Sequence, residues 1–125
     1  MLNRIPWRRG LGSSSAAAVA GAAAALRIAG AELDEQAILD LALPFEGHPD
    51  NLAPATAGGF TVAALDGKRA RFVRLAPPAL VAVALVPSFG VSTEAARELL
   101  PSTVSLADAV LELARAALAV AAVST

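Results

Sequence analysis

The sequence contains no cysteine and no tyrosine, and it has only one histidine, one tryptophan and one methionine among 125 residues. The absence of cysteine excludes disulfide bonds and thiolate metal ligands, and it is compatible with a reducing cytoplasm. Charged residues make up 17% of the chain and the formal net charge is −1, which argues against a nucleic-acid surface driven by charge. The 56% hydrophobic content is far from that of a disordered chain, and the length allows at most one ordinary domain.

Long hydrophobic runs are also missing, since no stretch reaches the roughly 18 apolar residues that a membrane span requires. An export signal is the competing interpretation of the N-terminus, because Arg4, Arg8 and Arg9 precede an apolar run at 16–26. That run is mostly alanine, which is weakly hydrophobic, and residues 12–15 before it are polar. We therefore expect a cytoplasmic protein that binds neither membrane nor nucleic acid.

Hydrophobic spacing, capping residues and chain breakers predict an α+β fold. The uninterrupted apolar run at 79–86 is typical of a central strand covered on both faces. The expected segments are a helix at 16–28 capped by Ser13 or Ser14, a helix at 33–43 capped by Asp34 and ended by Pro44, a loop with a helical start at 45–57, a hairpin with strands at 60–65 and 68–75 around an Asp66-Gly67 turn, a strand at 79–86, a short helix after Ser92 that stops before Pro101, and a helix from Ser105 with Asp108 as capping-box partner.

A glycine- and serine-rich turn at 10–15 runs directly into the alanine-rich helix. Glycines let the backbone approach a ligand closely, and the helix directs free N–H groups and the positive end of its dipole toward the turn. The serine hydroxyls can meet phosphate oxygens or a hydrated metal ion. The turn is not a Walker loop, because the only lysine is Lys68, and it lacks the third glycine of the dinucleotide fingerprint.

Two further stretches carry groups suited to chemistry. Glu46, His48 and Asp50 fall within a short segment stiffened by prolines, although a polar loop that satisfies its own backbone is the simpler interpretation. Thr93 and Arg97 share one helix face, where an arginine can hold a carboxylate with two hydrogen bonds, although a plain surface helix is equally consistent with the pattern. The basic residues at 68–74 are better explained as a solvated strand edge than as a nucleic-acid surface.

The pattern Pro6-x-x-x-Gly10-Leu11-Gly12-Ser13-Ser14-x-Ala16 resembles the phosphate-binding motif of the GHMP kinases. The stretches EGHPDNLAPATAGGF and STEAAR, which follow in the same order, are similar to signatures of the homoserine kinases within that superfamily. The resemblance implies a fragment of the GHMP kinase fold. Residues 1–75 would belong to the N-terminal, ribosomal protein S5 domain 2-like part, and 76–125 would begin the ferredoxin-like C-terminal part. We expect a central piece of such a kinase.

The resemblance also implies the chemistry, which is transfer of phosphate from ATP to the hydroxyl of L-homoserine with Mg²⁺, as in threonine biosynthesis. Another small-molecule GHMP kinase or a non-catalytic fragment is the alternative, and a homodimer is compatible with either. Because the chain is short for the family, we expect weak ATP binding by this piece alone. The implied site residues are Pro6, Arg8, Arg9, Gly10, Leu11, Gly12, Ser13, Ser14 and Ser15 for ATP, Ser14 and Glu46 for Mg²⁺, His48, Asp50, Thr93 and Arg97 for homoserine, and Ser14, Glu46 and Arg97 as catalytic residues.

Overall fold

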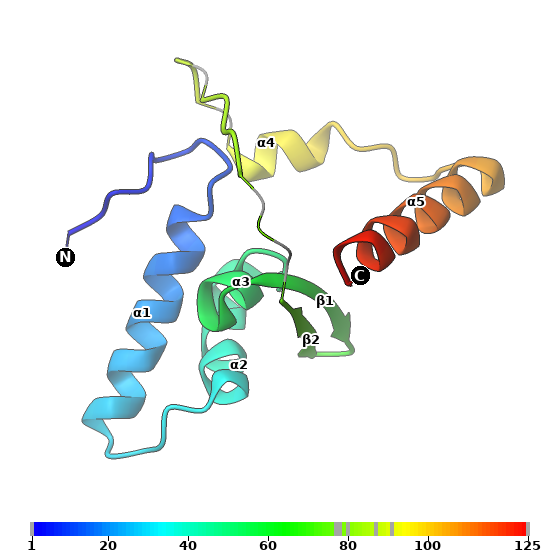
Figure 1. Cartoon of the computed structure of the whole chain (residues 1–125). Helices are drawn as coiled ribbons and strands as arrows, with labels where there is room; N and C mark the ends of the chain where they lie inside the picture. Colours follow the sequence, from blue (N-terminus) through cyan, green and yellow to red (C-terminus); the bar gives the residue numbers. More distant parts are fainter. Residues whose placement is uncertain (1, 77–78, 80, 87, 91, 125) are drawn as a thin grey trace.

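The computed structural model describes residues 2–76, 79, 81–86, 88–90 and 92–124. Its elements form an α+β arrangement in which a single antiparallel hairpin is the sheet of the described residues. Figure 1 shows α1, α2, α3 and the hairpin gathered together, with α5 standing apart from them. The elements are α1 (Ser13–Ile28), α2 (Glu35–Glu46), α3 (Leu52–Ala57), β1 (Phe60–Asp66), β2 (Arg69–Leu75), α4 (Thr93–Glu98) and α5 (Leu106–Ser124).

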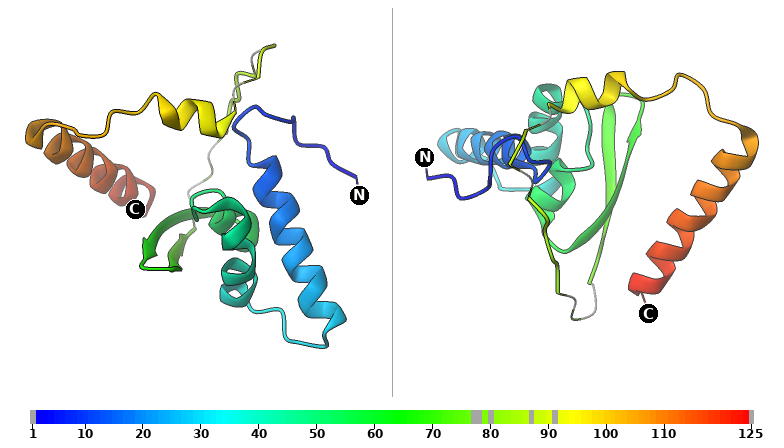
Figure 2. Two further views of the ribbon diagram at one scale, coloured as in Figure 1. Left: turned by 180° about the vertical axis from the view of Figure 1, so that it is seen from behind. Right: turned by 90° about the horizontal axis from the view of Figure 1, so that it is seen from above.

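The core lies where α1, α2 and α3 meet the inner face of the hairpin. Leu39 and Leu52 are completely buried, and Ala70 brings β2 into the same cluster. The alanine face of α1 allows α2 to approach closely, since small side chains keep the two backbones near each other, and Ala22 is buried at this contact. The view from above in Figure 2 shows the hairpin between these helices and α5. Burial of this core is what fixes α1 against α2.

The N-terminus of α1 differs from the prediction. The helix begins at Ser13, and the N-cap position is taken by Gly12 in the left-handed region, with no side-chain cap hydrogen bond. The prediction that Ser13 or Ser14 would cap the helix is therefore wrong. Glycine accepts this backbone conformation without a Cβ penalty, so the capping position needs no hydroxyl and the serines enter the first helical turn.

The end of α2 also differs from the prediction. Pro44 was expected to end the helix, but it lies inside α2, which continues to Glu46. Proline near the end of a helix costs only the hydrogen bond that its missing N–H would have donated, and its ring faces solvent here. Gly47 closes the helix in the left-handed conformation, and its N–H donates to the Leu43 carbonyl over 2.8 Å. The predicted N-cap is confirmed, since Asp34 accepts from the Ala37 N–H over 2.8 Å.

Beyond α2, the predicted loop is partly helical, because Leu52–Ala57 forms α3. The burial of Leu52 and Ala53 supports this short helix, which its prolines had masked in the sequence. The hairpin is confirmed, and the pairing of Asp66 with Arg69 moves its two-residue turn one position along from the expected place. Gly67 has a positive φ at the first turn position, as a type II′ turn requires.

The predicted central strand at 79–86 is not formed in the part of this segment that the structure describes. Residues 81–86 have no strand assignment, and the side chains of Val81, Val83 and Leu85 are more than four-fifths exposed. A strand is stable only when neighbouring strands satisfy its backbone groups and a layer covers its apolar faces. The hairpin does not extend to this segment, so the hydrophobic pattern alone does not produce a strand.

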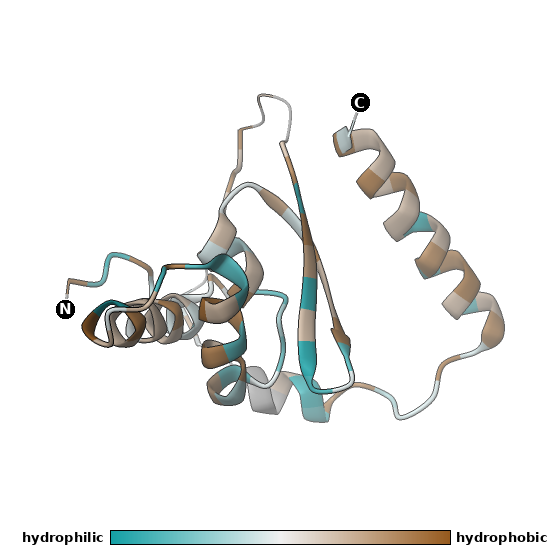
Figure 3. Cartoon of the chain, turned by 90° about the horizontal axis from the view of Figure 1, so that it is seen from below, coloured by the Kyte–Doolittle hydropathy of each residue, from teal (hydrophilic) through white to brown (hydrophobic). Residues whose placement is uncertain are grey.

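The helices of the last third follow the prediction in position. α4 ends before Pro101, and Ser105 starts α5 by accepting from the Asp108 N–H over 3.1 Å. The apolar face of α5 is not packed, since Leu106, Leu113 and Leu118 are at least 70% exposed. Figure 3 shows these hydrophobic positions along a helix that stands away from the core. Among the described residues, no helix is both long and apolar enough to cross a membrane.

Candidate functional site

The turn before α1 has the geometry of an anion cradle. Gly10 and Gly12 both have positive φ, at 68° and 72°, and Arg8 is the one described residue other than glycine with this property. No acidic side chain occupies the first turn of α1, and no side chain caps it. The first N–H groups of the helix therefore keep their hydrogen-bonding capacity, and the dipole adds positive potential at the same point.

Ser15 connects this turn to the acid of the second motif. Its Oγ donates to Glu46 Oε2 over 2.9 Å, and the residue is 1% exposed. These two residues are 31 positions apart and come from the start of α1 and the end of α2. Tertiary packing thus places the carboxylate directly beside the glycine- and serine-rich turn, which the sequence pattern by itself required but did not demonstrate.

The three serines are not equivalent. The Ser15 hydroxyl is buried and directed at the carboxylate, whereas Ser13 is half-buried and Ser14 is exposed at the turn. No described residue donates a hydrogen bond to the second carboxylate oxygen of Glu46, Oε1. One carboxylate with nearby hydroxyls fits Mg²⁺, which is usually held by one or two carboxylates, phosphate oxygens and water. The described residues contain no cluster of three or more acids and histidines, so an all-protein cage is not present there.

His48 and Asp50 lie close together in the segment between α2 and α3. His48 Nδ1 is 2.9 Å from Asp50 Oδ1, although the approach is not aligned as a hydrogen bond. The histidine side chain is 20% exposed and that of the aspartate is 64% exposed, so the pair opens to solvent on the carboxylate side. Asp50 Oδ1 also accepts from the Asn51 N–H over 3.0 Å, which fixes the chain direction at this point.

An open groove of about 490 Å³ runs beside the turn, between α1 and the start of α3. Its walls are mostly apolar, and Asn51 contributes a polar side chain at the end near Gly12. A methyl group on Gly12 would lie 3.7 Å from the Asn51 side chain, so the amide is in contact distance of the turn. The second motif therefore touches the turn at two places, through Glu46 and through Asn51.

The remaining predicted residues lie farther along the chain or on its surface. Thr93 and Arg97 belong to α4, as expected, and the Arg97 guanidinium makes no ion pair or hydrogen bond with a described residue. Pro6 and Arg8 are exposed ahead of the turn, and Leu11 lines the groove. No described contact joins α4 to His48 or Asp50.

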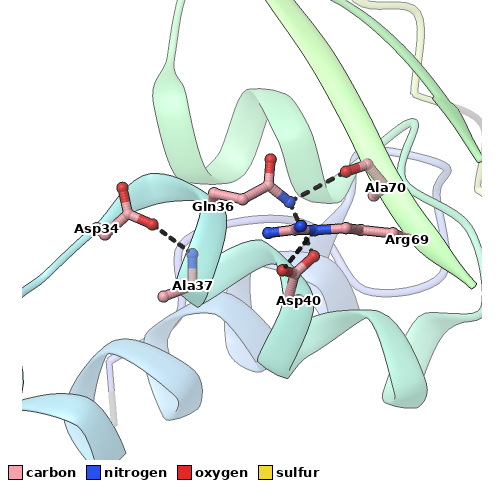
Figure 4. A network of polar contacts seen from close by, with 6 residues as sticks. All are labelled: Asp34, Gln36, Ala37, Asp40, Arg69 and Ala70. Carbon is pink, nitrogen blue, oxygen red and sulfur yellow. Dashed lines mark hydrogen bonds and ion pairs between the residues drawn. The ribbon is translucent and has the colours of Figure 1, made fainter.

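A polar network holds α2, and hence Glu46, against the hairpin (Figure 4). Gln36 Nε2 donates to Asp40 Oδ1 over 2.8 Å and to the Ala70 carbonyl over 3.0 Å. Arg69 Nε donates to Asp40 Oδ2 over 3.2 Å. The Ala70 residue is buried, so the Gln36 contact satisfies a carbonyl that water does not reach. These contacts link the strand of the hairpin to the helix that carries the acid.

The sequence pattern missed the role of Ser15 as partner of Glu46, since all three serines were assigned to ATP. A signal was present, because a residue two positions into a helix that packs on another helix is often buried. Contacts of Arg9 with distant carbonyl groups were also not predictable, as they depend on how the chain folds back.

Comparisons with known proteins define the class of this chain. Residues 1–59 match the family described as the GHMP kinases N terminal domain, which includes the turn, Glu46 and Asn51. The chain is 50% identical to the homoserine kinase of Deinococcus radiodurans over 96% of its own length, and 45% identical to that of Moorella thermoacetica over its whole length. It is 51% identical to the homoserine kinase of Desulfitobacterium hafniense over 94% of its length.

The chain therefore belongs to the GHMP kinases. Within them, its sequence falls with the homoserine kinases, as the resemblance of the three motifs predicted. It spans about two fifths of the length of these curated relatives, between 39% and 43% for the three above. No solved structure matches it.

Proposed function

We propose that this chain supplies the phosphate-binding and metal-binding part of an ATP-dependent homoserine kinase, which phosphorylates the side-chain hydroxyl of L-homoserine to O-phospho-L-homoserine. The observation that carries the proposal is the hydrogen bond between Ser15 and Glu46, which joins the anion cradle to a carboxylate. Relatives that carry the name homoserine kinase favour this substrate over other alcohols used by GHMP kinases.

The residues divide the work in a way that suits phosphoryl transfer, which depends on positioning and on neutralising charge. The N–H groups at the start of α1, with the Ser13 and Ser14 hydroxyls, would hold the β- and γ-phosphates. Glu46, through Oε1, with Ser14 would hold Mg²⁺, which neutralises phosphate charge when bound. His48 and Asp50 would orient the amino acid.

Thr93 and Arg97 would complete the substrate site by binding the homoserine carboxylate, since a guanidinium can hold it with two hydrogen bonds. No described residue is placed as a strong base for the hydroxyl, and the proton would pass to the phosphate itself. This part of the proposal requires α4 to approach the turn, which is the subject of the next section.

The proposal is tested by an NMR titration of the ¹⁵N-labelled chain with Mg·ATP, a method that detects millimolar binding. We expect weak, saturable shifts at the amides of Gly10, Gly12, Ser13 and Ser14, with smaller changes in α5. Transfer of labelled phosphate to L-homoserine is measured in parallel. Absence of any shift at the turn would leave a non-catalytic fragment as the function of this chain, and phosphorylation of another alcohol in preference would indicate a different GHMP kinase.

Replacing Ser15 with alanine separates the buried serine from the two accessible ones. We expect the variant to lose about 1 kcal/mol of unfolding free energy, because Glu46 Oε2 then lacks its donor. The apparent affinity for Mn²⁺, used as a paramagnetic substitute for Mg²⁺ and read from line broadening, should fall by about 10- to 100-fold, as for other residues that orient a metal ligand.

The matched control is Ser14→Ala, whose hydroxyl is exposed and which should leave the stability unchanged. If Ser15→Ala has the stability and the Mn²⁺ affinity of the unmodified chain, the buried hydrogen bond has no role in the site.

A further inference from the structure

Arg9 lies in the turn, yet its guanidinium contacts a segment 79 residues away. Nη2 donates to the Ser88 carbonyl over 2.9 Å. Nη1 donates to the Arg8 carbonyl over 3.2 Å and makes a longer contact of 3.5 Å with the Trp7 carbonyl. A single cation therefore gathers carbonyl groups from residues 7–8 and from residue 88 at one point. A lysine, with one compact ammonium group, cannot reproduce this arrangement.

The segment 88–90 is shaped to receive this side chain. A methyl group on Gly90 would lie 2.6 Å from Arg9 Nη1 and 3.3 Å from the Arg8 carbonyl, which no real contact permits. The φ of Gly90 is not in the left-handed region, so the backbone itself would accept other residues. The glycine at 90 is thus required for space against Arg9 rather than for backbone conformation.

The segment that Arg9 holds leads directly into α4. Figure 2 shows, in both of its views, the start of α4 beside the loop that precedes α1. α4 begins at Thr93, three residues after Gly90, and carries Arg97. The contact between Arg9 and Ser88 is therefore a link between the turn that would hold phosphate and the helix that would hold homoserine.

Arg9 has donors to spare for an anion. A guanidinium has five N–H groups, and the contacts with Trp7, Arg8 and Ser88 use three of them. The Nε–H and one Nη2–H remain for a phosphate oxygen in the adjacent turn. The same side chain can therefore contact a bound phosphate and the Ser88 carbonyl at once.

We propose that Arg9 is a positioning residue that fastens segment 88–90 to the phosphate turn and so couples nucleotide binding to the placement of α4. The coupling to nucleotide rests on the function proposed above, whereas the fastening itself does not. Arg9 holds the segment in the free chain, and a phosphate in the turn fixes the guanidinium further through its two remaining donors. The substrate helix is then held in place when the nucleotide is bound.

The fastening is tested in the free chain by ¹⁵N relaxation. In the unmodified protein we expect order parameters above about 0.7 at Ser88 and Gly90, and values below about 0.6 in Arg9→Ala, the range of flexible backbone. Gly90→Ala should have the same effect, because the added methyl displaces the guanidinium. The double variant should be no more mobile than either single one, as expected for two changes that remove one contact. Arg4→Ala, which removes a charge from the same N-terminal segment without a described contact, is the control.

Titration with Mg·ATP tests the coupling separately. In the unmodified chain, shifts should appear at the turn and at residues 88–90, and in Arg9→Ala only those at the turn should remain. Equal mobility of segment 88–90 in all variants would overturn the fastening while leaving the proposed function intact. Loss of turn shifts in the unmodified chain would instead reject the proposed function. Shifts at the turn of the unmodified chain with none at 88–90 would reject the coupling alone.

Discussion

Replacing Glu46 with glutamine is expected to abolish divalent-metal binding at the turn while leaving the fold in place. The amide oxygen of glutamine can still accept from Ser15 Oγ, which now donates to Oε2 over 2.9 Å, so α1 and α2 stay joined. The amide has no charge to offer a hard cation, which prefers carboxylate oxygen. We expect the apparent Mn²⁺ affinity in the presence of ATP to fall by about 100-fold or more, since even residues that only orient a ligand cost 10- to 100-fold.

The measurement is the Mn²⁺ concentration that half-broadens the amide resonances of Ser14 and Glu46. Glu32→Gln removes the same charge from an exposed position just ahead of α2 and should leave this concentration unchanged. If E46Q and the unmodified chain broaden at the same Mn²⁺ concentration, Glu46 is not the metal ligand, and the metal part of the proposal fails.

Replacing Leu39 with alanine is expected to give the largest loss of stability. Leu39 is completely buried at the contact of α2 with α1 and the hairpin. Truncating a buried leucine removes apolar burial and leaves a cavity, which costs about 2–5 kcal/mol. Small domains are stable by only about 5–15 kcal/mol, so the variant should unfold at a much lower urea concentration. The free energy of unfolding is obtained from urea titration followed by circular dichroism at 222 nm.

Leu41 provides the matched control for this variant. It lies two residues further along α2 and is 45% exposed, so Leu41→Ala should cost less than about 1 kcal/mol. Similar losses for the two variants would mean that the packing of α2 against α1 and the hairpin does not hold the folded state together. The phosphate turn and Glu46 would then lack the rigid support that the proposed site requires.

The sequence predicted the elements whose signals are local. Asp34 capping α2, Ser105 capping α5 and the Gly67 turn of the hairpin depend on neighbouring residues, and all three lie at or within one position of the expected place. The errors have non-local causes. Pro44 remains helical because Gly47 closes the helix beyond it, and the strand expected at 79–86 lacks the neighbours that an apolar strand requires.

The candidate site was predictable as a set of motifs but not as a geometry. The order of the turn, the acidic segment and the threonine–arginine helix was sufficient to identify the GHMP kinases, and the comparisons confirm that membership. Which hydroxyl faces Glu46 was not predictable, because three consecutive serines are alike in sequence and only the packing of α1 on α2 makes Ser15 the buried one. The roles of His48, Asp50, Thr93 and Arg97 stay predictions.

The sequence by itself determined the chemical groups of this protein: a flexible, hydroxyl-rich turn ahead of a helix of small residues, a lone acid within a proline-stiffened segment, and a distant arginine. Those features depend on residue type and spacing along the chain. Only the tertiary structure decided which of them meet. Side chains far apart in sequence come within hydrogen-bonding distance where burial of the Leu39 and Leu52 core brings α1 against α2, and where Arg9 reaches the Ser88 carbonyl.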